Sequence, residues 1–278
     1  MKYLCIMEQD LPHTERQGHR ENLEKLSALE LLQGINEEDQ TVARVAQSVI
    51  PEIAAFVDAL VPRMLQGGRL FYIGAGTSGR LGIVDASECP PTFGVPHGMV
   101  IGLIAGGDDA IRKAVEFAED DETQGWQDLL GNNIQSIDTV VGIAASGRTP
   151  YVIGAVTEAR KHGLLTACIT CNMGSKLEEA VEHPFVAVTG PEFVTGSTRM
   201  KAGTVQKLIL NMISTATMIR LGRVQGTRMV DMQLSNNKLV DRGTRMVMEA
   251  TGLSAEHAEK LLTTHGSVRK AVEHHNKG

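Results

Sequence analysis

The chain has 278 residues, of which 42% are hydrophobic, enough to bury the core of one large α/β domain with a small appendage, or of two domains. Lys and Arg total 27 against 33 Asp and Glu, so the net charge is -6 and nucleic acid is not an expected partner. No stretch has signal-peptide or transmembrane character, since the longest apolar run, 205–221, is interrupted by polar residues, and we expect a cytoplasmic protein.

The four cysteines, Cys5, Cys89, Cys168 and Cys171, are too few and too scattered for a disulfide framework. The spacing of Cys168 and Cys171 occurs in redox and zinc motifs, but these two accompany an expected strand at 164–170 and not a helix start. We interpret them as ordinary strand and loop cysteines. The nine histidines show no zinc spacing, and no metal is expected.

The N-terminal third of the chain reads as an arm followed by helices. Residues 1–36 are polar and mixed, and leucines at 26, 29, 31 and 32 predict one short amphipathic helix in an arm or lid. From Glu37 to Met64, apolar residues recur every three or four positions, which predicts a helical stripe. Pro51 and Pro62 fall inside this stripe and predict two helices or a kink.

Strands and helices then alternate. Strands are expected at 69–74, 99–105, 138–144, 164–170 and 184–189, and helices at 79–88, 108–124, 150–162, 175–181 and 198–221. Five nearly continuous apolar strands separated by helices predict an α/β fold, in which a five-stranded parallel sheet is sandwiched by helices within residues 37–222. Residues 223–278 predict short helices in a small C-terminal module. Ligands of such sheets bind outside the carboxyl ends of the strands, so we look for the function in the loops that follow them.

The first of these loops, 74–79, has the spacing Gly-x-Gly-x-x-Gly. A dinucleotide site would also need an acidic residue about 20 residues on, at the tip of the next strand. The expected strand 99–105 ends in two glycines instead. Thr77 and Ser78 add hydroxyls that can donate to phosphate oxygens, so the loop favours a phosphate over a nicotinamide or flavin cofactor.

Two later loops share this chemistry. Residues 145–150 and 194–201 follow the third and fifth strands, and both combine glycine with hydroxyls and add Arg or Lys. In any one loop, helix N-capping could explain the hydroxyls. Three such loops at one edge of a sheet predict a cradle for a monophosphate on a small polar body, such as a sugar phosphate.

The motif Ser-Gly-Arg-Thr-Pro at 146–150 resembles the phosphate loop of sugar isomerase (SIS) domains. Taken with the segments 74–82, 85–94, 105–107 and 196–204, the chain resembles the N-acetylmuramic acid 6-phosphate etherase family over about residues 20–255. This resemblance implies a three-layer, flavodoxin-like SIS fold and a phosphosugar ligand. The same motifs occur in glucokinase regulatory proteins, so a non-catalytic sugar-phosphate regulator is one alternative function, and an aldose–ketose phosphosugar isomerase is another.

The family's chemistry removes D-lactate from C3 of the sugar by elimination and then adds water. One group takes the C2 proton and another protonates the departing ether oxygen. The resemblance implies Glu88 as the proton donor and Glu119 as the second carboxylate, which we assign as the base. Pro90 and Pro91 are expected to stop the helix after Glu88 and to hold its carboxylate partly buried. Periodicity alone does not distinguish Glu119 from Glu122.

Binding roles also follow from the resemblance. Hydroxyls of the first loop would hold the phosphate or a neighbouring hydroxyl, the second loop would hold the phosphate, and the third loop would hold the sugar or the lactyl carboxylate. The residues are Thr77, Ser78, Ser146, Gly147, Thr149, Ser197, Thr198 and Arg199. Arg148 and Lys201 either contact the ligand or form structural pairs. No cofactor is needed, and a homodimer is expected because SIS domains commonly pair.

Overall fold

The computed structural model describes residues 11–277. Cys5 and the first ten residues of the expected N-terminal arm, 1–36, therefore lie outside the described part. The chain divides into two compact units. The first contains the residues up to 86 together with 101–213, and the second contains 87–100 together with the residues from 214 on. The expected C-terminal module, 223–278, falls within the second unit.

The two N-terminal helices are separated where the sequence predicts a break, but the first of them begins earlier than expected. Two 3-10 turns, η2 (His13–Glu15) and η3 (Leu23–Lys25), precede α1 (Ala28–Ser48) and α2 (Ile50–Leu65). The axes of α1 and α2 are bent by 51°, and Pro51 lies in the first turn of α2, which confirms the predicted break. No separate short helix forms at the leucines, because α1 begins at Ala28 and runs through residue 36 without interruption.

A reciprocal pair of hydrogen bonds fixes where α1 begins. The Ser27 hydroxyl accepts the Glu30 N–H at 3.3 Å, and the Glu30 carboxylate accepts the Ser27 N–H at 2.8 Å.

Within the described residues, no helix by itself is long and apolar enough for a membrane span, and the bent pair of α1 and α2 meets that test only when the two are counted together.

The sheet contains β1 (Leu70–Gly74), β2 (Val100–Ile104), β3 (Thr139–Ile143), β4 (Leu165–Thr170) and β5 (His183–Val186), in the order β2-β1-β3-β4-β5. Leu70 lies opposite Thr139 in a parallel ladder, and the pairs β3–β4 and β4–β5 are parallel as well. This order confirms the predicted flavodoxin-like α/β fold. Because the strands are parallel, their carboxyl ends meet at one edge of the sheet.

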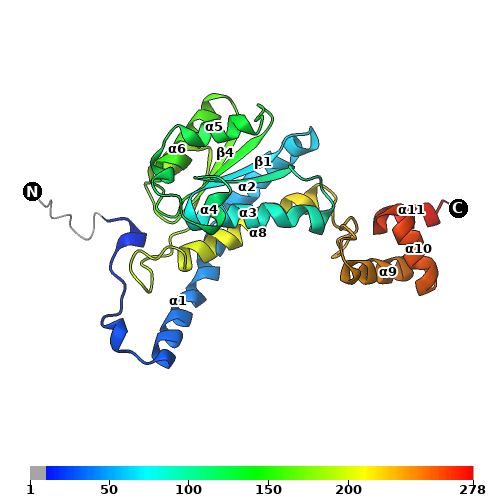
Figure 1. Ribbon diagram of the computed structural model, residues 1–278, viewed down its shortest axis with the longest axis horizontal. Coiled ribbons are helices and arrows are strands. Elements are labelled where there is room, and N and C mark those ends of the chain that lie inside the picture. The colour runs from blue at the N-terminus through cyan, green and yellow to red at the C-terminus, as the bar shows by residue number, and fades with distance from the viewer. Residues whose placement is uncertain (1–10, 278) are drawn as a thin grey trace, which may run out of the picture. The chain divides into compact units, whose positions relative to one another are not determined.

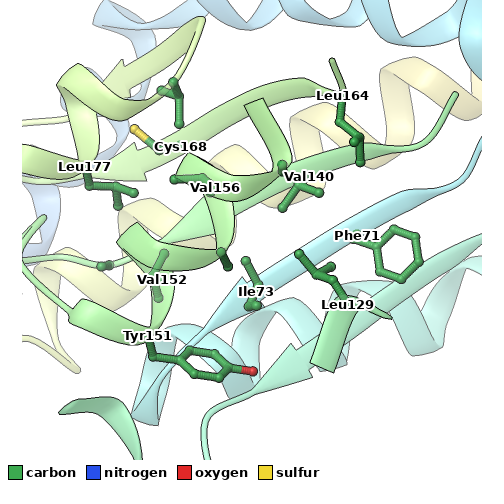
Figure 2. Close-up of a cluster of buried hydrophobic side chains, with 14 of the residues drawn as sticks. Phe71, Ile73, Leu129, Val140, Tyr151, Val152, Val156, Leu164, Cys168 and Leu177 are labelled. Atoms are coloured by element: carbon green, nitrogen blue, oxygen red, sulfur yellow. The ribbon is translucent and has the colours of Figure 1, made fainter. Parts of the chain in front are cut away.

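Helices cover both faces of the sheet. The helices α5 (Gln124–Gly131) and α6 (Pro150–Lys161) lie on one face, and α2, α3 (Gly76–Phe93) and α8 (Lys201–Arg220) lie on the other (Figure 1). A short α7 (Lys176–Ala180) joins β4 to β5. The apolar side chains between the sheet and α6 are fully buried, among them Phe71, Ile73, Val140, Val152 and Val156 (Figure 2).

A glycine lets α6 pack closely against the central strand. A Cβ atom at Gly142 would lie 2.8 Å from Val152 Cγ1 and 2.9 Å from Val156 Cγ1. A larger residue at this place in β3 would therefore push α6 off the sheet. Since α6 begins directly after the Ser146 loop, its close packing also fixes the position of that loop.

The expected helix 108–124 is wrong. The structure has only four helical residues, α4 (Asp109–Arg112), then an extended stretch and a 3-10 turn, η4 (Ala118–Asp120), before α5, which was not predicted. A continuous helix would place like charges one turn apart, Glu116 beside Asp120 and Glu119 beside Glu122, which destabilises a helix. The apolar residues that suggested the helix instead lie near the ends of β1 and β2.

The expected end of α3 is also wrong. Pro90 and Pro91 lie within the helix, which continues to Phe93. A proline lacks the N–H of one helical hydrogen bond but its carbonyl still accepts one, and the Gly94 N–H donates to the Pro90 carbonyl at 2.9 Å. Gly94 has a φ of 63°, so a left-handed glycine ends this helix.

The second unit contains α9 (Asn237–Thr251), α10 (Ala255–His265) and α11 (Val268–His275). Each helix begins at a side chain that accepts a backbone N–H, supplied in turn by Asn236, Ser254 and Ser267. The three helices bury a small core of their own, which contains Val230, Met232, Val247, Ala258, Leu262 and Ala271. The prediction of short C-terminal helices is confirmed.

Cys168 lies on β4 and Cys171 directly follows it, and both are fully buried. Burial raises the pKa of each thiol to about 12. Thiols of such high pKa are protonated and unreactive near neutral pH, which supports the interpretation as ordinary cysteines. Within residues 11–277, no group of three or more His, Cys, Asp or Glu side chains is placed to hold a metal ion.

The buried thiols predict a loss of stability in alkali. Their pKa is 9.0 in the unfolded chain and about 12 in the folded protein, so their contribution is complete below pH 9 and is lost as the pH rises from 9 to 12. The free energy of unfolding, measured in urea, should fall by up to about 1.4 kcal/mol per pH unit for each thiol. The double variant Cys168→Ala, Cys171→Ala should fall less steeply, and an equal slope would contradict the prediction.

Candidate active site

The loop after β1 is held against the sheet by its glycines. A Cβ atom at Gly74 would lie 2.6 Å from the Gly79 nitrogen, and one at Gly79 would lie 2.6 Å from Ile104 Cγ1. These close contacts bring the N-terminus of α3 next to the ends of β1 and β2. An anion is favoured at such a position.

The two hydroxyls of this loop differ in their surroundings. Ser78 is buried, and its hydroxyl donates to Oε1 of Gln206 on α8 at 3.0 Å. Thr77 is half-buried, and its methyl group lies 3.3 Å from the position of a Cβ atom at Gly203, in the first turn of α8. The Ser78 side chain thus joins two helices, and Thr77 is the more accessible of the two hydroxyls.

The loop after β3 contains Ser146, Gly147, Arg148 and Thr149. Gly147 has a φ of 65°, and a Cβ atom there would lie 2.3 Å from the Ser175 hydroxyl. Thr149 occupies the N-cap position of α6, yet its side chain makes no capping hydrogen bond. Helix capping therefore does not explain Thr149, which strengthens its prediction as a ligand-binding residue. Arg148 is exposed.

The loop before α8 contains a buried carboxylate. Both oxygens of Glu192 accept N–H groups of the first turn of α8, from Lys201 and Ala202, each at 2.9 Å. The buried Lys201 ammonium forms an ion pair with the half-buried Glu38 of α1. This ion pair supports the interpretation of Lys201 as a structural pair. Ser197 and Thr198 are half-buried and Arg199 is exposed.

The N-terminal segment crosses the carboxyl edge of the sheet. Nδ2 of Asn172, which follows β4, donates to the Thr14 hydroxyl at 3.0 Å and to the Ala145 carbonyl at 2.8 Å. The Gly18 N–H donates to the Thr195 hydroxyl at 3.2 Å. The segment therefore connects the loops that follow β3, β4 and β5.

Beneath this segment lies a hollow of about 200 Å³, lined by Arg16, Ser146, Arg148 and Asn172 among others. Two arginines make it a favourable place for an anion. Sequence reasoning missed Asn172 although it follows a strand, where ligand loops are sought. Arg16 gave no signal because it precedes the sheet within a polar stretch.

A second pocket of about 200 Å³ contains Glu119. It lies at the carboxyl ends of β1 and β2, where Ala75, Gly76 and Ala105 line it, and Glu119 of η4 contributes to its wall. Glu122 does not line this pocket. The fold thus distinguishes Glu119 from Glu122, which the spacing of apolar residues in the sequence could not do.

Arg80 of α3 fixes the segment that leads to Glu119. Its Nε donates to the Ile111 carbonyl and its Nη2 to the Ala110 carbonyl, both at 2.7 Å. The two bonds hold the end of α4, from which residues 113–117 return to the pocket. Sequence reasoning did not assign a role to Arg80.

Glu88 lies on α3, where the side chain is exposed. The expected partial burial of its carboxylate is therefore wrong. Glu88 belongs to the second unit and Glu119 to the first. The shared action of the two glutamates on one sugar stays a prediction.

The strand order and the hydroxyl-bearing loops at one sheet edge define a protein of the SIS class. Residues 52–160 match the family model described as the glucokinase regulatory protein N-terminal SIS domain. The fold is also that of a phosphoheptose isomerase from Francisella tularensis, which is 18% identical and has a TM-score of 0.53 over 68% of this chain and 100% of that chain.

The sequence relatives are closer. The chain is 61% identical over 269 residues to the N-acetylmuramic acid 6-phosphate etherase of Christiangramia forsetii, covering 97% of this chain and 98% of that protein. It is 61% identical over 260 residues to the enzyme of the same name from Porphyromonas gingivalis, covering 94% and 95%. The chain therefore belongs to the N-acetylmuramic acid 6-phosphate etherase family.

Proposed function

We propose that this protein is a carbon–oxygen lyase that cleaves the D-lactyl ether of N-acetylmuramic acid 6-phosphate, giving N-acetylglucosamine 6-phosphate and D-lactate for the recycling of cell-wall sugars. Family membership supports the substrate. The observation that carries the mechanism is that Glu119, and not Glu122, lines a pocket shared with the glycine-rich loop after β1. A phosphosugar bound at the sheet edge can thus present its carbon skeleton to a carboxylate.

The reaction has two steps. The C1 aldehyde of the opened sugar makes the C2 proton acidic, and the Glu119 carboxylate takes this proton. The electron pair of the C2–H bond forms the C2–C3 double bond, the C3–O bond breaks, and Glu88 protonates the departing lactyl oxygen. Water then adds to C3 and a proton returns to C2. Elimination and hydration leave the oxidation state unchanged, so the chemistry needs no redox cofactor.

The loops bind the substrate. Ser146 and Thr149 hold the phosphate, with the left-handed Gly147 forming the turn between them, assisted by Thr77, while the Ser78 side chain supports the site through Gln206. The third loop holds the sugar hydroxyls or the lactyl carboxylate through Ser197, Thr198 and Arg199. Arg148 of the same loop and Arg16 of the N-terminal segment add positive charge near the same ligand.

Removing the Thr149 hydroxyl is expected to weaken substrate binding. A hydrogen bond to a charged group contributes about 1.5–3 kcal/mol, so Thr149→Val should raise KM by about tenfold or more, with a smaller change in kcat. Thr149→Ser, which keeps the hydroxyl, should stay within about threefold of wild type. Thr157→Val on the same helix is the matched control. A KM unchanged in Thr149→Val would contradict the phosphate role.

Lactate release distinguishes the candidate functions. The purified protein is incubated with N-acetylmuramic acid 6-phosphate, and D-lactate and the sugar product are measured. Binding of hexose phosphates without lactate release would favour a regulator, and conversion of one hexose phosphate into another would favour an isomerase. We also propose a cytoplasmic homodimer, which light scattering of the purified protein tests for its oligomeric state.

A further inference from the structure

Phe117 has an unusual backbone and an unusual exposure. Its φ of 61° and ψ of 0° lie in the left-handed region, where a bulky side chain is strained. The other described residues with positive φ that are not glycine are Asn22 and Asn133, and asparagine tolerates this conformation. The Phe117 ring is also 80% exposed to solvent. Neither feature stabilises the fold by itself.

The position of Phe117 relates these features to the pocket. It is the N-cap residue of η4, the turn that carries Glu119, and it lines the same pocket. The remaining wall contains small apolar residues, including Ala75, Ala105 and Ala110, together with the charged side chains of Arg80 and Glu116. The pocket therefore joins charged side chains, among them the Glu119 carboxylate, to an apolar surface with an aromatic ring beside it.

Strained residues and exposed aromatic rings persist where function uses them. We propose that the Phe117 ring packs over the methyl-bearing substituents next to the C2–C3 bond of the substrate, the acetamido group on C2 and the lactyl group on C3, and so determines specificity. This inference rests on the proposed function, because it takes Glu119 to act at C2. The left-handed backbone at residue 117 directs the ring and Glu119 toward one ligand.

The substrate chemistry fits such a surface. N-acetylmuramic acid 6-phosphate offers hydroxyls and a phosphate to the loops after β1 and β3, and its acetamido group on C2 and lactyl group on C3 each carry a methyl group. Covering a methyl group with an aromatic ring removes apolar area from water and favours binding. A hexose phosphate that lacks these groups has nothing for the ring to cover, so Phe117 should discriminate between the two.

The test uses substitutions that separate the ring from the backbone. Phe117→Asn removes the ring and tolerates the left-handed conformation, whereas Phe117→Tyr keeps the ring. Asn133→Gly, at a left-handed position that does not line this pocket, is the matched control. For each protein, kcat/KM for lactate release, inhibition constants of N-acetylglucosamine 6-phosphate and glucose 6-phosphate, and Tm are measured.

Phe117→Asn should raise the inhibition constant of N-acetylglucosamine 6-phosphate by about tenfold while that of glucose 6-phosphate stays the same, and kcat/KM should fall by a similar factor. Its Tm should stay the same or rise by about 2–4 °C, because the backbone strain is relieved. Phe117→Tyr should keep the preference, and Asn133→Gly should change neither inhibition constant.

If Phe117→Asn keeps the wild-type preference for N-acetylglucosamine 6-phosphate over glucose 6-phosphate, the inference is overturned, whether Tm falls or stays the same. A shift in oligomeric state with an unchanged preference would assign the ring to a contact with a second copy, and it would overturn the inference too. If the wild type releases no lactate, the proposed function fails, while dissociation constants of the same two ligands, measured by titration calorimetry, still test whether Phe117 recognises the acetamido methyl group.

Discussion

Glu119→Gln is expected to lower kcat for lactate release by about 10²–10⁴, because an amide cannot take the C2 proton. Binding of N-acetylglucosamine 6-phosphate should stay close to that of wild type, since the phosphate loops are unchanged. Glu122→Gln, in the same acidic run but outside the pocket, is the matched control and should retain most activity. Equal losses in the two variants, or full activity in Glu119→Gln, would contradict the assignment of the base.

Exchange of the C2 hydrogen with deuterated water separates the roles of the two glutamates. If Glu119 is the base, Glu119→Gln should lose both exchange and lactate release. If Glu88 is the acid, Glu88→Gln should release little lactate while it still binds the ligand and exchanges the C2 hydrogen. Lactate release at the wild-type rate in Glu88→Gln would refute its role, and loss of exchange in that variant alone would reverse the two assignments.

Gly147→Ala is expected to cause the largest loss of stability that a single methyl group produces in the phosphate loops. The new Cβ atom would lie 2.3 Å from the Ser175 hydroxyl, and the φ of 65° strains any residue with a side chain. Left-handed strain of about 1–2 kcal/mol and overpacking of about 1–3 kcal/mol together predict a loss of about 2–5 kcal/mol. Urea unfolding measures this free energy.

The matched control for Gly147 is Gly163, which has a φ of 76° and no atom within 4 Å of an added Cβ. Gly163→Ala should lose only the left-handed strain, about 1–2 kcal/mol, and should keep its affinity for the substrate. Gly147→Ala should lose affinity as well, because Ser146 and Thr149 flank the displaced residue. Equal losses of stability in the two variants would show that the contact with Ser175 has no effect.

The local pattern of apolar residues was sufficient to predict an element where burial alone decided its conformation. The three inner strands, β1, β3 and β4, are short apolar runs, so their burial on both faces could be predicted. The parallel order of the sheet followed from the intervening helices. The expected helix 108–124 failed because the apolar spacing at residues 111–118 is compatible with a helix, while the closely spaced acidic residues and the packing at the sheet edge oppose one.

The sequence predicted which loops form the candidate site, but it could not predict the contacts of each side chain in them. Glycine and hydroxyls after the first and third strands indicated a phosphate cradle, but the pattern could not show that Ser78 donates to Gln206, 128 residues away. The ion pair of Lys201 with Glu38 joins residues that are 163 positions apart in the sequence. Partners of this kind depend on how α1, α3 and α8 pack, which no local spacing records.

The sequence by itself determined the α/β class, the five strands and the loops whose hydroxyls favour a phosphate, because strand burial and turn chemistry depend on neighbouring residues. Tertiary structure alone decided that Glu119 and not Glu122 lines the pocket. It also decided that the N-terminal segment crosses the sheet edge through Thr14 and Asn172. These choices depend on contacts between segments far apart in the chain, and the free energy of those contacts outweighs the local preferences.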